Sequence, residues 1–581
     1  MVLGGCGACI VLLSKYDPVL DQVEDFTISS CLTLLCSVNG CSVTTSEGLG
    51  NSKDGFHPIH QRFSGFHASQ CGFCTPGMCV SLFGALVKAE KNDQREPSPG
   101  FSKLTVVEAE KAISGNLCRC TGYRPIADAC KSFAADVDIE DLGLNSFWKK
   151  EESREAKMSR LPLYDHNHEI CTFPEFLKRE IKSSLLLDSE RYSWCTPATV
   201  EELQSLLKSI DADCKTRMKL VVGNTGMGYY KDLEHHDRYI DLGCVLELSS
   251  IRRDEEGIEI GAAVTISKTI EALKEENNSE FNSECKIVFK RIALHMEKIA
   301  SEFVRNTGSV GGNLVMAQRK HFPSDIATIL LAAGAFVHIL TGTLHEKLTL
   351  DEFLERPPLD SKSVLLNIKI PNYAASKNIS SEMDSKLLFE TYRAAPRPLG
   401  NALPYLNAAF LSEVSCLKSS GSAVLNKCRV VFGAYGTKHA IRAKEVEKFL
   451  SGKILTIGVL YEAVKLVKAN VVPEDGTPSP AFRSSLAAGY LFDFLYPLID
   501  INSKISGVWS DEYCNTSLFK DAKIKQKYSQ LDHVQLPTLL SSSEQVLELN
   551  NDHHPVGQPT KKVGAALQAS GLLSSIIELH K

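Results

Sequence analysis

The chain has 581 residues, enough for three to five domains at about 150 residues per domain. Hydrophobic residues make up 43% of the chain and charged residues 23%, which excludes a wholly disordered chain and a fibrous one. The net charge is −6, from 64 basic and 70 acidic residues, so no strong basic field favours nucleic acid as a partner.

The amino terminus predicts neither a secretion signal nor a membrane anchor. Residues 1–13 are almost all apolar or small, but no basic residue precedes them and no small-residue cleavage site follows. The longest apolar stretch, 329–340, is far shorter than the ~20 residues that span a bilayer. We therefore expect a cytoplasmic chain without a membrane anchor, whose thiols stay reduced.

Cysteine spacing carries the first chemical signal. Of the 19 cysteines, 11 lie within the first 130 residues. In a reducing compartment such a density favours metal or iron–sulfur ligation over disulfides. Cys71 and Cys74 form a C-x2-C pair, and Cys118 and Cys120 form a C-x-C pair that begins 44 residues after Cys74.

Both pairs are expected at helix ends. One helix is predicted over 79–91, and another opens at Thr105, where Glu108 completes a capping box. Backbone N–H groups at helix ends can bond thiolate sulfurs and stabilise their charge. A structural zinc site is the alternative, and the C-x-C spacing disfavours it because that spacing is rare among zinc sites.

A second cysteine group lies at the start of the chain. Cys6 and Cys9 form a C-x2-C pair after two glycines, and Cys31 follows. Plant-type [2Fe–2S] ferredoxins use C-x4-C-x2-C and a distant fourth cysteine, but Met1 stands where the first ligand belongs. We interpret two further cysteines as apolar packing residues in strands over 32–43, namely Cys36 and Cys41.

The middle of the chain combines strands with glycine-rich loops. A strand over 219–222 runs into the loop 223–228, which does not match the G-x-G-x-x-G pattern. A second glycine-rich loop covers 306–313. Either loop alone could be an ordinary turn, but two of them favour a phosphate clamp built from backbone amides.

The last third alternates strands and helices before it becomes polar. A strand is predicted over 428–432 and a helix over 456–467, and the charges of Arg393 and Arg397 are interpreted as part of a solvated face. From Asn502 the composition predicts a solvated linker.

Three motifs together resemble the molybdenum hydroxylases, the family of xanthine dehydrogenases and aldehyde oxidases. They are Gly4–Cys9, Gln70–Met78 and Gly115–Tyr123. Two further segments, Phe56–Arg62 and 143–150, are most similar to plant aldehyde oxidases. The resemblance continues to about Gly571.

The resemblance implies an α+β multidomain chain. It would begin with a partial β-grasp ferredoxin-like domain (1–50), a helical [2Fe–2S] domain (51–147) and a linker (148–188). An FAD domain of the vanillyl-alcohol oxidase type (189–374), an α+β subdomain like the C-terminal domain of CO dehydrogenase flavoprotein (385–500), and a linker with the start of a molybdenum domain (501–581) would follow.

The resemblance also implies the cofactor ligands. The first cluster would use Cys6, Cys9 and Cys31 and lack a fourth thiolate, and the second would use Cys71, Cys74, Cys118 and Cys120. Gln70 matches a residue that binds molybdopterin in the family. The residues implied to contact FAD are Leu220, Val221, Val222, Gly223, Asn224, Thr225, Gly226, Met227, Ile299 (where the family often has Phe), Ser309, Gly311, Gly312, Asn313, Asp325 and Leu403.

Full-length family members oxidise an aldehyde at molybdenum and pass electrons through the two clusters and FAD to dioxygen. This chain is expected to lack the molybdenum domain, its molybdopterin and its aldehyde pocket, and so to hold no catalytic residue for the aldehyde. It would be an iron–sulfur and FAD electron-transfer portion whose flavin could meet dioxygen or NADH. Two alternatives stay open: a subunit that pairs with a separate molybdenum chain or with a second copy of itself, and a non-enzymatic fragment.

Overall fold

The structure is a computed structural model. It describes residues 4–499 and 551–572, except for gaps at 19, 92–95, 98, 144, 148–152, 154–156, 158–159, 166–171, 180–184, 190–191, 212–216, 231–235, 276–282, 361, 374–382, 398–399, 401, 418–422, 435–439 and 556–558. The polar stretch that we interpret as a linker, 501–550, lies outside the described residues.

The first domain is a small antiparallel sheet in the order β2-β1-β3, formed by β1 (Ile10–Asp17), β2 (Gln22–Ser29) and β3 (Ser42–Thr44). The strand interpretation of 32–43 is wrong for both of its cysteines. Cys36 lies in the 3-10 helix η1 (Leu35–Val38) and Cys41 precedes β3. Ser37 explains the turn, because its backbone N–H and its hydroxyl both donate to the carbonyl of Leu34.

A helical domain follows and packs on this sheet. Its helices are α1 (Ser46–Leu49), α2 (Pro58–Gly65), α3 (Thr75–Glu90), α4 (Val106–Ala112) and α5 (Arg124–Lys131), followed by η2 (Ile139–Asp141). The capping box at the start of α4 is confirmed, because Thr105 and Glu108 bond each other's backbone N–H groups. The core includes Phe63, Met78 and Phe133, and the buried guanidinium of Arg62 lies 4.0 Å from the Phe133 ring centre.

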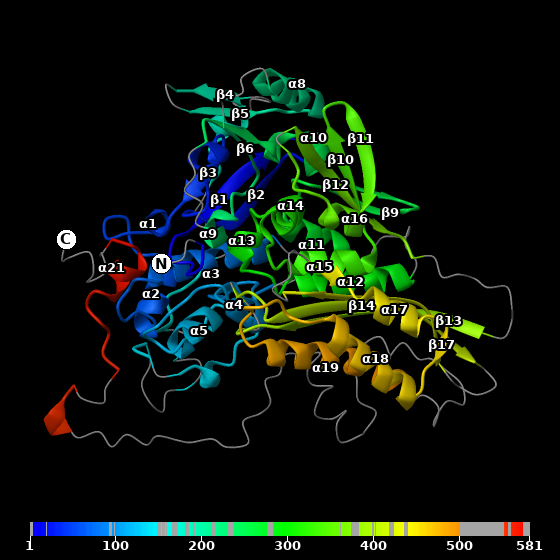
Figure 1. The fold of residues 1–581 in the computed structure, drawn as a ribbon. Helices are drawn as coiled ribbons and strands as arrows, with labels where there is room; N and C mark the ends of the chain where they lie inside the picture. Colours follow the sequence, from blue (N-terminus) through cyan, green and yellow to red (C-terminus); the bar gives the residue numbers. More distant parts are fainter. Residues whose placement is uncertain are drawn as a thin grey trace.

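The next part of the chain contains two sheets (Figure 1). In the first, three parallel strands and one antiparallel strand have the order β4-β5-β7-β6, with β4 (Leu185–Asp188), β5 (Ser193–Thr196), β6 (Met218–Val221) and β7 (Arg238–Asp241). In the second, all antiparallel, the order is β11-β10-β12-β9-β8, with β8 (Ile251–Asp254), β9 (Gly257–Gly261), β10 (Phe336–Thr341), β11 (Leu344–Thr349) and β12 (Ser363–Pro371).

Helices pack around these two sheets. Two of them share a large core with the second sheet, α12 (Ser283–Met296) and α15 (Asp325–Ala333). The other helices of this region are α7 (Glu175–Arg179), α8 (Val200–Asp211), α9 (Met227–Tyr230), η3 (Leu242–Cys244), α10 (Leu246–Ser249), α11 (Ile266–Lys274), α13 (Glu302–Arg305), α14 (Val310–Lys320) and α16 (Leu350–Glu355).

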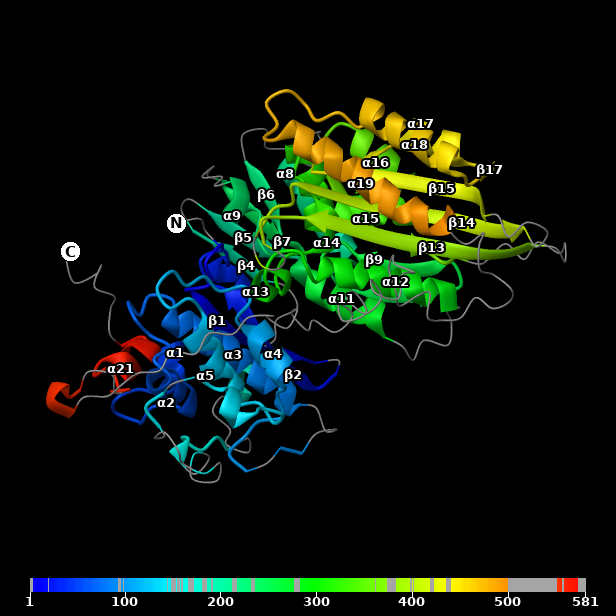
Figure 2. The ribbon, with the colours of Figure 1, turned by 90° about the horizontal axis from the view of Figure 1, so that it is seen from below.

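A third sheet lies between two layers of helices (Figures 1 and 2). Its strands are β13 (Met383–Ala394), β14 (Leu406–Leu417), β15 (Ala423–Gly433), β16 (Ile441–Arg442) and β17 (Lys453–Ile454). Alternate side chains of β14 point to opposite faces. Ala409 and Leu411 therefore join the core with α12 and α15, while Ala408 and Phe410 join the core with α17 (Lys444–Leu450), α18 (Ile457–Asn470) and α19 (Pro480–Ile499).

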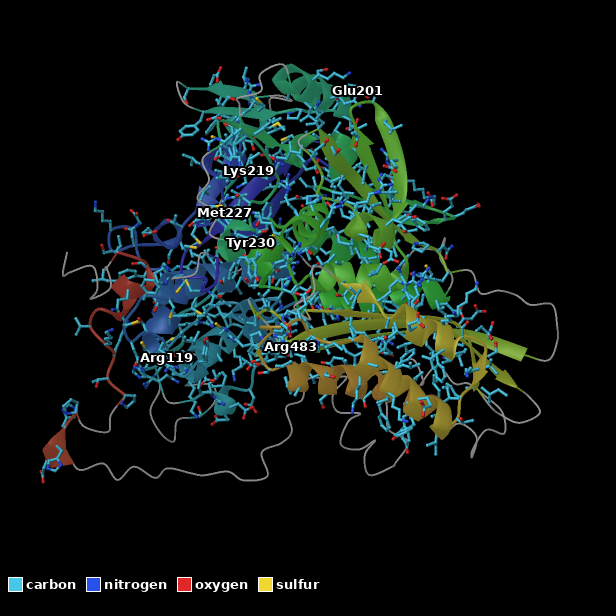
Figure 3. All side chains as sticks on the ribbon, in the orientation of Figure 1. Arg119, Glu201, Lys219, Met227, Tyr230 and Arg483 are labelled. Carbon is cyan, nitrogen blue, oxygen red and sulfur yellow. The ribbon has the colours of Figure 1, made fainter. Side chains whose placement is uncertain are left out.

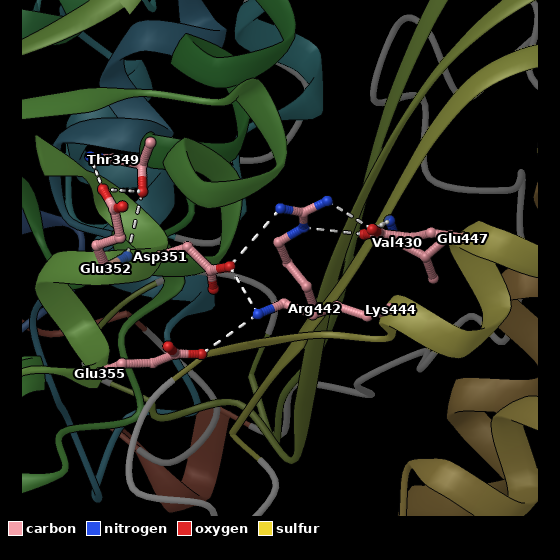
Figure 4. Close-up of polar contacts among 8 residues, drawn as sticks. All are labelled: Thr349, Asp351, Glu352, Glu355, Val430, Arg442, Lys444 and Glu447. Carbon is pink, nitrogen blue, oxygen red and sulfur yellow. Dashed lines mark hydrogen bonds and ion pairs between the residues drawn. The ribbon is translucent and has the colours of Figure 1, made fainter.

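Charged side chains join this third sheet to the preceding domain (Figure 4). Asp351 on α16 lies 3.6 Å from Arg442 and 3.0 Å from Lys444. Arg442 also pairs with the buried carboxylate of Glu447 at 2.6 Å, and Glu447 accepts a hydrogen bond from the Val430 N–H. The shared ion pairs and the shared apolar core make the two parts one packed unit.

The last described segment returns to the helical domain. After η7 (Asn551–His553), the short helix α21 (Ala565–Ala569) lies beside α2 (Figures 1 and 2). Within the described residues, no helix has both the length and the apolar content that crossing a bilayer requires.

Candidate cofactor sites

The four cysteines predicted to hold the second cluster come together at the starts of two helices. Cys74 is the N-cap of α3, and Cys118 and Cys120 lie in the turn before α5. Cys118 lies close enough to Cys74 to raise the pKa of its thiol, and Cys71 does the same to the Cys120 thiol. Cys74 is buried, whereas Cys71 and Cys120 are exposed, so one side of the group faces the surface.

The surroundings of these thiols differ. Burial, followed by the nearby Cys118, raises the pKa of the Cys74 thiol well above its usual value. Burial also acts to raise the pKa of Cys118, but hydrogen bonds with Thr121 and with backbone N–H groups outweigh it and lower this pKa. Thr121 Oγ1 lies 3.1 Å from the Cys118 sulfur. Such hydrogen bonds stabilise a thiolate, the form that binds iron.

The number of thiols in this group matches the ligand count of a binuclear cluster. A [2Fe–2S] cluster contains two irons and is held by four thiolates. The four cysteines supply that donor set.

The first cysteine group is ordered around Ser29. The Ser29 hydroxyl lies 3.4 Å from the sulfurs of both Cys9 and Cys31, and the Gly4 N–H donates to the Cys31 sulfur at 3.1 Å. Every cysteine that the structure describes carries a free thiol. The structure brings Cys9 and Cys31 together, and Cys6 lies in the same loop as Cys9.

Asn116, which the sequence analysis missed, connects the two cysteine groups. Its buried side-chain amide donates to the Gly7 carbonyl at 3.1 Å and accepts from the Ser81 hydroxyl at 3.0 Å. Next to it, the Leu117 N–H donates to the Cys6 carbonyl at 2.9 Å. The loop between Cys6 and Cys9 therefore lies against the segment that leads into Cys118.

The first glycine-rich loop has the form of an anion-binding nest. It follows β6, and Asn224 adopts the left-handed conformation, with φ of 52°. Within the described residues, none of the four N–H groups from Gly223 to Gly226 donates to an acceptor. Successive free N–H groups in such a loop form a concave site for a phosphate.

The second glycine-rich loop lies against the first. A Cβ atom added to Gly223 would lie 1.9 Å from the Thr307 carbonyl oxygen, so only glycine permits this approach. Ser309 is the N-cap of α14, and Gly311, Gly312 and Asn313 lie in its first turn. The N–H groups of residues 310–313 all donate to protein oxygens, namely those of Val264, Ala262 and Ser309. The N–H groups that remain free to bind a phosphate are therefore those of the first loop, residues 223–226.

Polar contacts of the two glycine-rich loops also reach the first cysteine group. The side chain of Asn224 donates to the Leu32 carbonyl at 3.0 Å, one residue beyond Cys31. The side chain of Asn306 donates to the Thr27 carbonyl of β2 at 2.9 Å. The thiol loop and both glycine-rich loops thus form one continuous region.

Further along the loops, polar contacts connect α9 to β6 and α14. Lys219 Nζ lies 3.9 Å from the Met227 sulfur, and the Tyr230 hydroxyl donates to the Lys320 carbonyl at the end of α14. Figure 3 shows Lys219, Met227 and Tyr230 in one region, and Arg119, which lies between Cys118 and Cys120, in another.

Asp325 belongs to a buried ion network. Its carboxylate lies 3.1 Å from His295 Nε2 and 3.2 Å from Arg393 Nε. The interpretation of Arg393 as part of a solvated face is wrong, because its side chain is only 4% exposed. Burial acts to raise the pKa of Asp325, but His295 and Arg393 outweigh it and lower this pKa.

The remaining predicted flavin residues lie around this network. Ser324, the N-cap of α15, donates to the side chain of Asn313. Arg393 also donates to the Ala402 carbonyl beside Leu403, whose side chain is 41% exposed. A β-bridge joins residues 300 and 400, next to Ile299. The structure therefore brings Ile299, Asn313, Asp325 and Leu403 into one neighbourhood.

We expect Asp325→Ala to destabilise the chain by about 3–5 kcal/mol at pH 7, because Arg393 stays buried without its partner. The pKa of Asp325 is lowered in the folded chain, so its contribution is present above the unfolded pKa of about 4 and is lost as pH falls through the folded pKa. Urea unfolding of the unchanged chain and of Asp325→Ala, at pH 7 and at pH 3, measures the difference in their free energies of unfolding. A difference that does not shrink at the lower pH would contradict the ion-pair explanation.

Comparison with known proteins defines the relationship. Three family models match: a [2Fe–2S] binding domain over residues 45–131, an FAD binding domain in molybdopterin dehydrogenase over 190–373, and a CO dehydrogenase flavoprotein C-terminal domain over 390–498. Two relatives from Arabidopsis thaliana match 98% of this chain: an indole-3-acetaldehyde oxidase at 59% identity and an abscisic-aldehyde oxidase at 56%. The chain belongs to the plant aldehyde oxidase family. The fold class and the family inferred from the sequence are confirmed.

This aldehyde oxidase-like chain spans about 40% of the length of those two Arabidopsis relatives. A probable aldehyde oxidase 4 of Oryza sativa subsp. japonica is 49% identical over 98% of this chain and 66% of the relative. Among solved structures, quinoline 2-oxidoreductase from Pseudomonas putida 86 aligns over 54% of this chain with 20% identity and a TM-score of 0.41. Two of the three matching family models describe domains that bind [2Fe–2S] and FAD.

Proposed function

We propose that this chain is an electron-transfer module of an aldehyde oxidase, which conducts electrons from a [2Fe–2S] centre at its surface to FAD. The observation that carries the proposal is the continuous series of contacts between the three sites. The exposed Cys71 and Cys120 lie at one end, Asn116 joins the two cysteine groups, and Asn224 joins the Cys31 loop to the glycine-rich loops.

The residues present fit the two cofactors. Cys71, Cys74, Cys118 and Cys120 would hold one cluster, while Cys6, Cys9 and Cys31 would supply three thiolates to another. The nest of N–H groups after β6 would hold the FAD pyrophosphate, and residues around Asp325 and Leu403 would line the flavin. When bound, the clusters supply one-electron steps and the flavin accepts or delivers electron pairs.

Aldehyde oxidation belongs to the full-length relatives in this proposal. We expect molybdopterin, and a contact of Gln70 with it, only where a molybdenum domain is present, in a longer chain or in a partner chain. Gln70 is exposed, as a residue that contacts a cofactor in another domain or chain would need to be. We predict a cytoplasmic location, because thiolate ligands need reducing conditions. We also predict that dioxygen or NADH reacts at the flavin.

Substrate tests distinguish this proposal from its alternatives. With this chain alone, we expect no reduction of an artificial dye by acetaldehyde or an indole aldehyde, because thiolate-bound clusters carry single electrons and cannot deliver oxygen from water. NADH oxidation with dioxygen would be consistent with a working flavin site. Aldehyde-dependent dye reduction without a partner chain would contradict the proposal, and failure with both substrates would favour a non-enzymatic fragment.

A further inference from the structure

The 562–572 segment packs on the cysteine loop of the second cluster. It includes α21, and its small residues Ala565, Ala569 and Ser570 are buried against the helical domain. Ala569 belongs to the same apolar core as α2 and α3, and its carbonyl accepts a hydrogen bond from Ser46 at 2.7 Å. This segment follows the cysteine loop by almost 500 residues in the chain, yet both form one surface.

Gln568 is the central polar contact of this packing. Its side-chain oxygen accepts from the Ser69 hydroxyl at 2.9 Å and from Lys562 Nζ at 2.6 Å. Its side-chain nitrogen donates to the Cys71 carbonyl at 3.3 Å. Gln568 is 5% exposed, so water does not replace these bonds.

The loop is built to receive this side chain. Gly72 has a φ of 84°, and a Cβ atom there would lie 2.7 Å from Gln568 Cδ, so glycine leaves the space that Gln568 occupies. Ser69 also accepts from the Thr75 hydroxyl at 3.1 Å, at the first residue of α3 after Cys74. Lys562 donates to the Gln70 carbonyl as well. Gln568 therefore reaches both Cys71 and, through Ser69, the start of the helix that follows Cys74.

We propose that Gln568 is a positioning residue for the [2Fe–2S] ligand loop 69–74, which it holds in its ligating conformation from the 562–572 segment. The inference rests on the proposed function, since that function assigns the cluster to this loop. Gln568 donates to the backbone carbonyl of one ligand, so its effect passes through the peptide of Cys71.

The first test compares the rates at which purified 581-residue chains release iron to a chelator. For Gln568→Ala we expect release about tenfold faster than from the unchanged chain, because the loop loses its buried hydrogen bonds. Gln61→Ala is the matched control, since Gln61 also donates one amide bond to a carbonyl of this domain, that of Phe56 at 2.7 Å. The control should stay within about twofold. Equal release rates from all three chains would overturn the proposal.

A second variant separates positioning from simple docking. Gln568→Glu keeps the acceptor for Ser69 and Lys562 but loses the donor to the Cys71 carbonyl. We expect its iron release to be faster than that of the unchanged chain, as in Gln568→Ala, because the Cys71 carbonyl loses its donor. The electron paramagnetic resonance signal of the reduced cluster should also shift as in Gln568→Ala. An unshifted signal in Gln568→Glu would overturn the positioning role.

Amide hydrogen exchange of the metal-free chain makes the two proposals separable. The amides of residues 69–74 should exchange faster in Gln568→Ala than in the unchanged chain. In the control Gln61→Ala they should exchange at the same rate as in the unchanged chain. If the unchanged chain binds no iron but this exchange difference appears, the cluster assignment fails and the loop contact stands. If iron binds and exchange is unchanged, Gln568 does not position the loop.

Discussion

Expressed as residues 1–581 alone and purified from iron-replete cells, the polypeptide is expected to contain about two irons, the content of one [2Fe–2S] cluster. The reason is the number of thiolates. Cys71, Cys74, Cys118 and Cys120 form a complete donor set, while the first group supplies only Cys6, Cys9 and Cys31. An iron with an open coordination position is exposed to loss, so the first cluster should not persist.

Single substitutions then assign the iron to its site. Cys118→Ser should remove nearly all of it, because its thiolate is one of the four that the cluster needs. Cys9→Ser should leave the iron content unchanged, as should the control Cys36→Ser, because Cys36 lies on η1 and is not a predicted ligand. Iron quantitation with visible absorption measures each content. About four irons in the unchanged chain, or two retained in Cys118→Ser, would contradict the assignment.

Local signals in the sequence predict the elements that carry these sites. The capping box of Thr105 and Glu108 involves residues three positions apart, so the sequence alone contains it. The same holds for the strand before Gly223, which corresponds to β6. The meeting of the two cysteine pairs is implied by the family resemblance and not by their spacing.

Contacts between distant segments are what the sequence does not predict. Arg393 is buried because Asp325, 68 residues away, neutralises it, and nothing near Arg393 in the chain indicates this. Asn116 and Gln568 bond to backbone carbonyls that are 109 and 497 residues away. A carbonyl is present at every residue, so such a partner leaves no pattern in the sequence.

The second glycine-rich segment shows a different limit. Its composition predicts a loop over 306–313, but the last four of these residues begin α14. Ser309 explains this, because it is a favourable N-cap and its side chain accepts from the Gly312 N–H. Glycine content alone therefore does not distinguish a phosphate loop from the first turn of a capped helix.

Gly223→Ala is expected to reduce the flavin bound per chain to about a tenth or less. The added Cβ would lie 1.9 Å from the Thr307 carbonyl oxygen, a backbone atom that cannot rotate away. The two glycine-rich loops would have to separate, and overpacking of this kind costs about 1–3 kcal/mol. Flavin released by denaturation and measured by fluorescence gives the content. Gly489→Ala is the matched control, because nothing lies within 4 Å of a Cβ at that glycine of α19.

Two comparisons make this result specific. The iron content of the helical domain should be unchanged in Gly223→Ala, which separates loss of flavin from unfolding of the chain. Gly312→Ala should lose less flavin than Gly223→Ala, because the N–H groups of residues 310–313 already donate to protein oxygens and those of residues 223–226 do not. If Gly312→Ala lost more flavin than Gly223→Ala, the pyrophosphate would belong at the start of α14, and the assignment to the loop after β6 would be wrong.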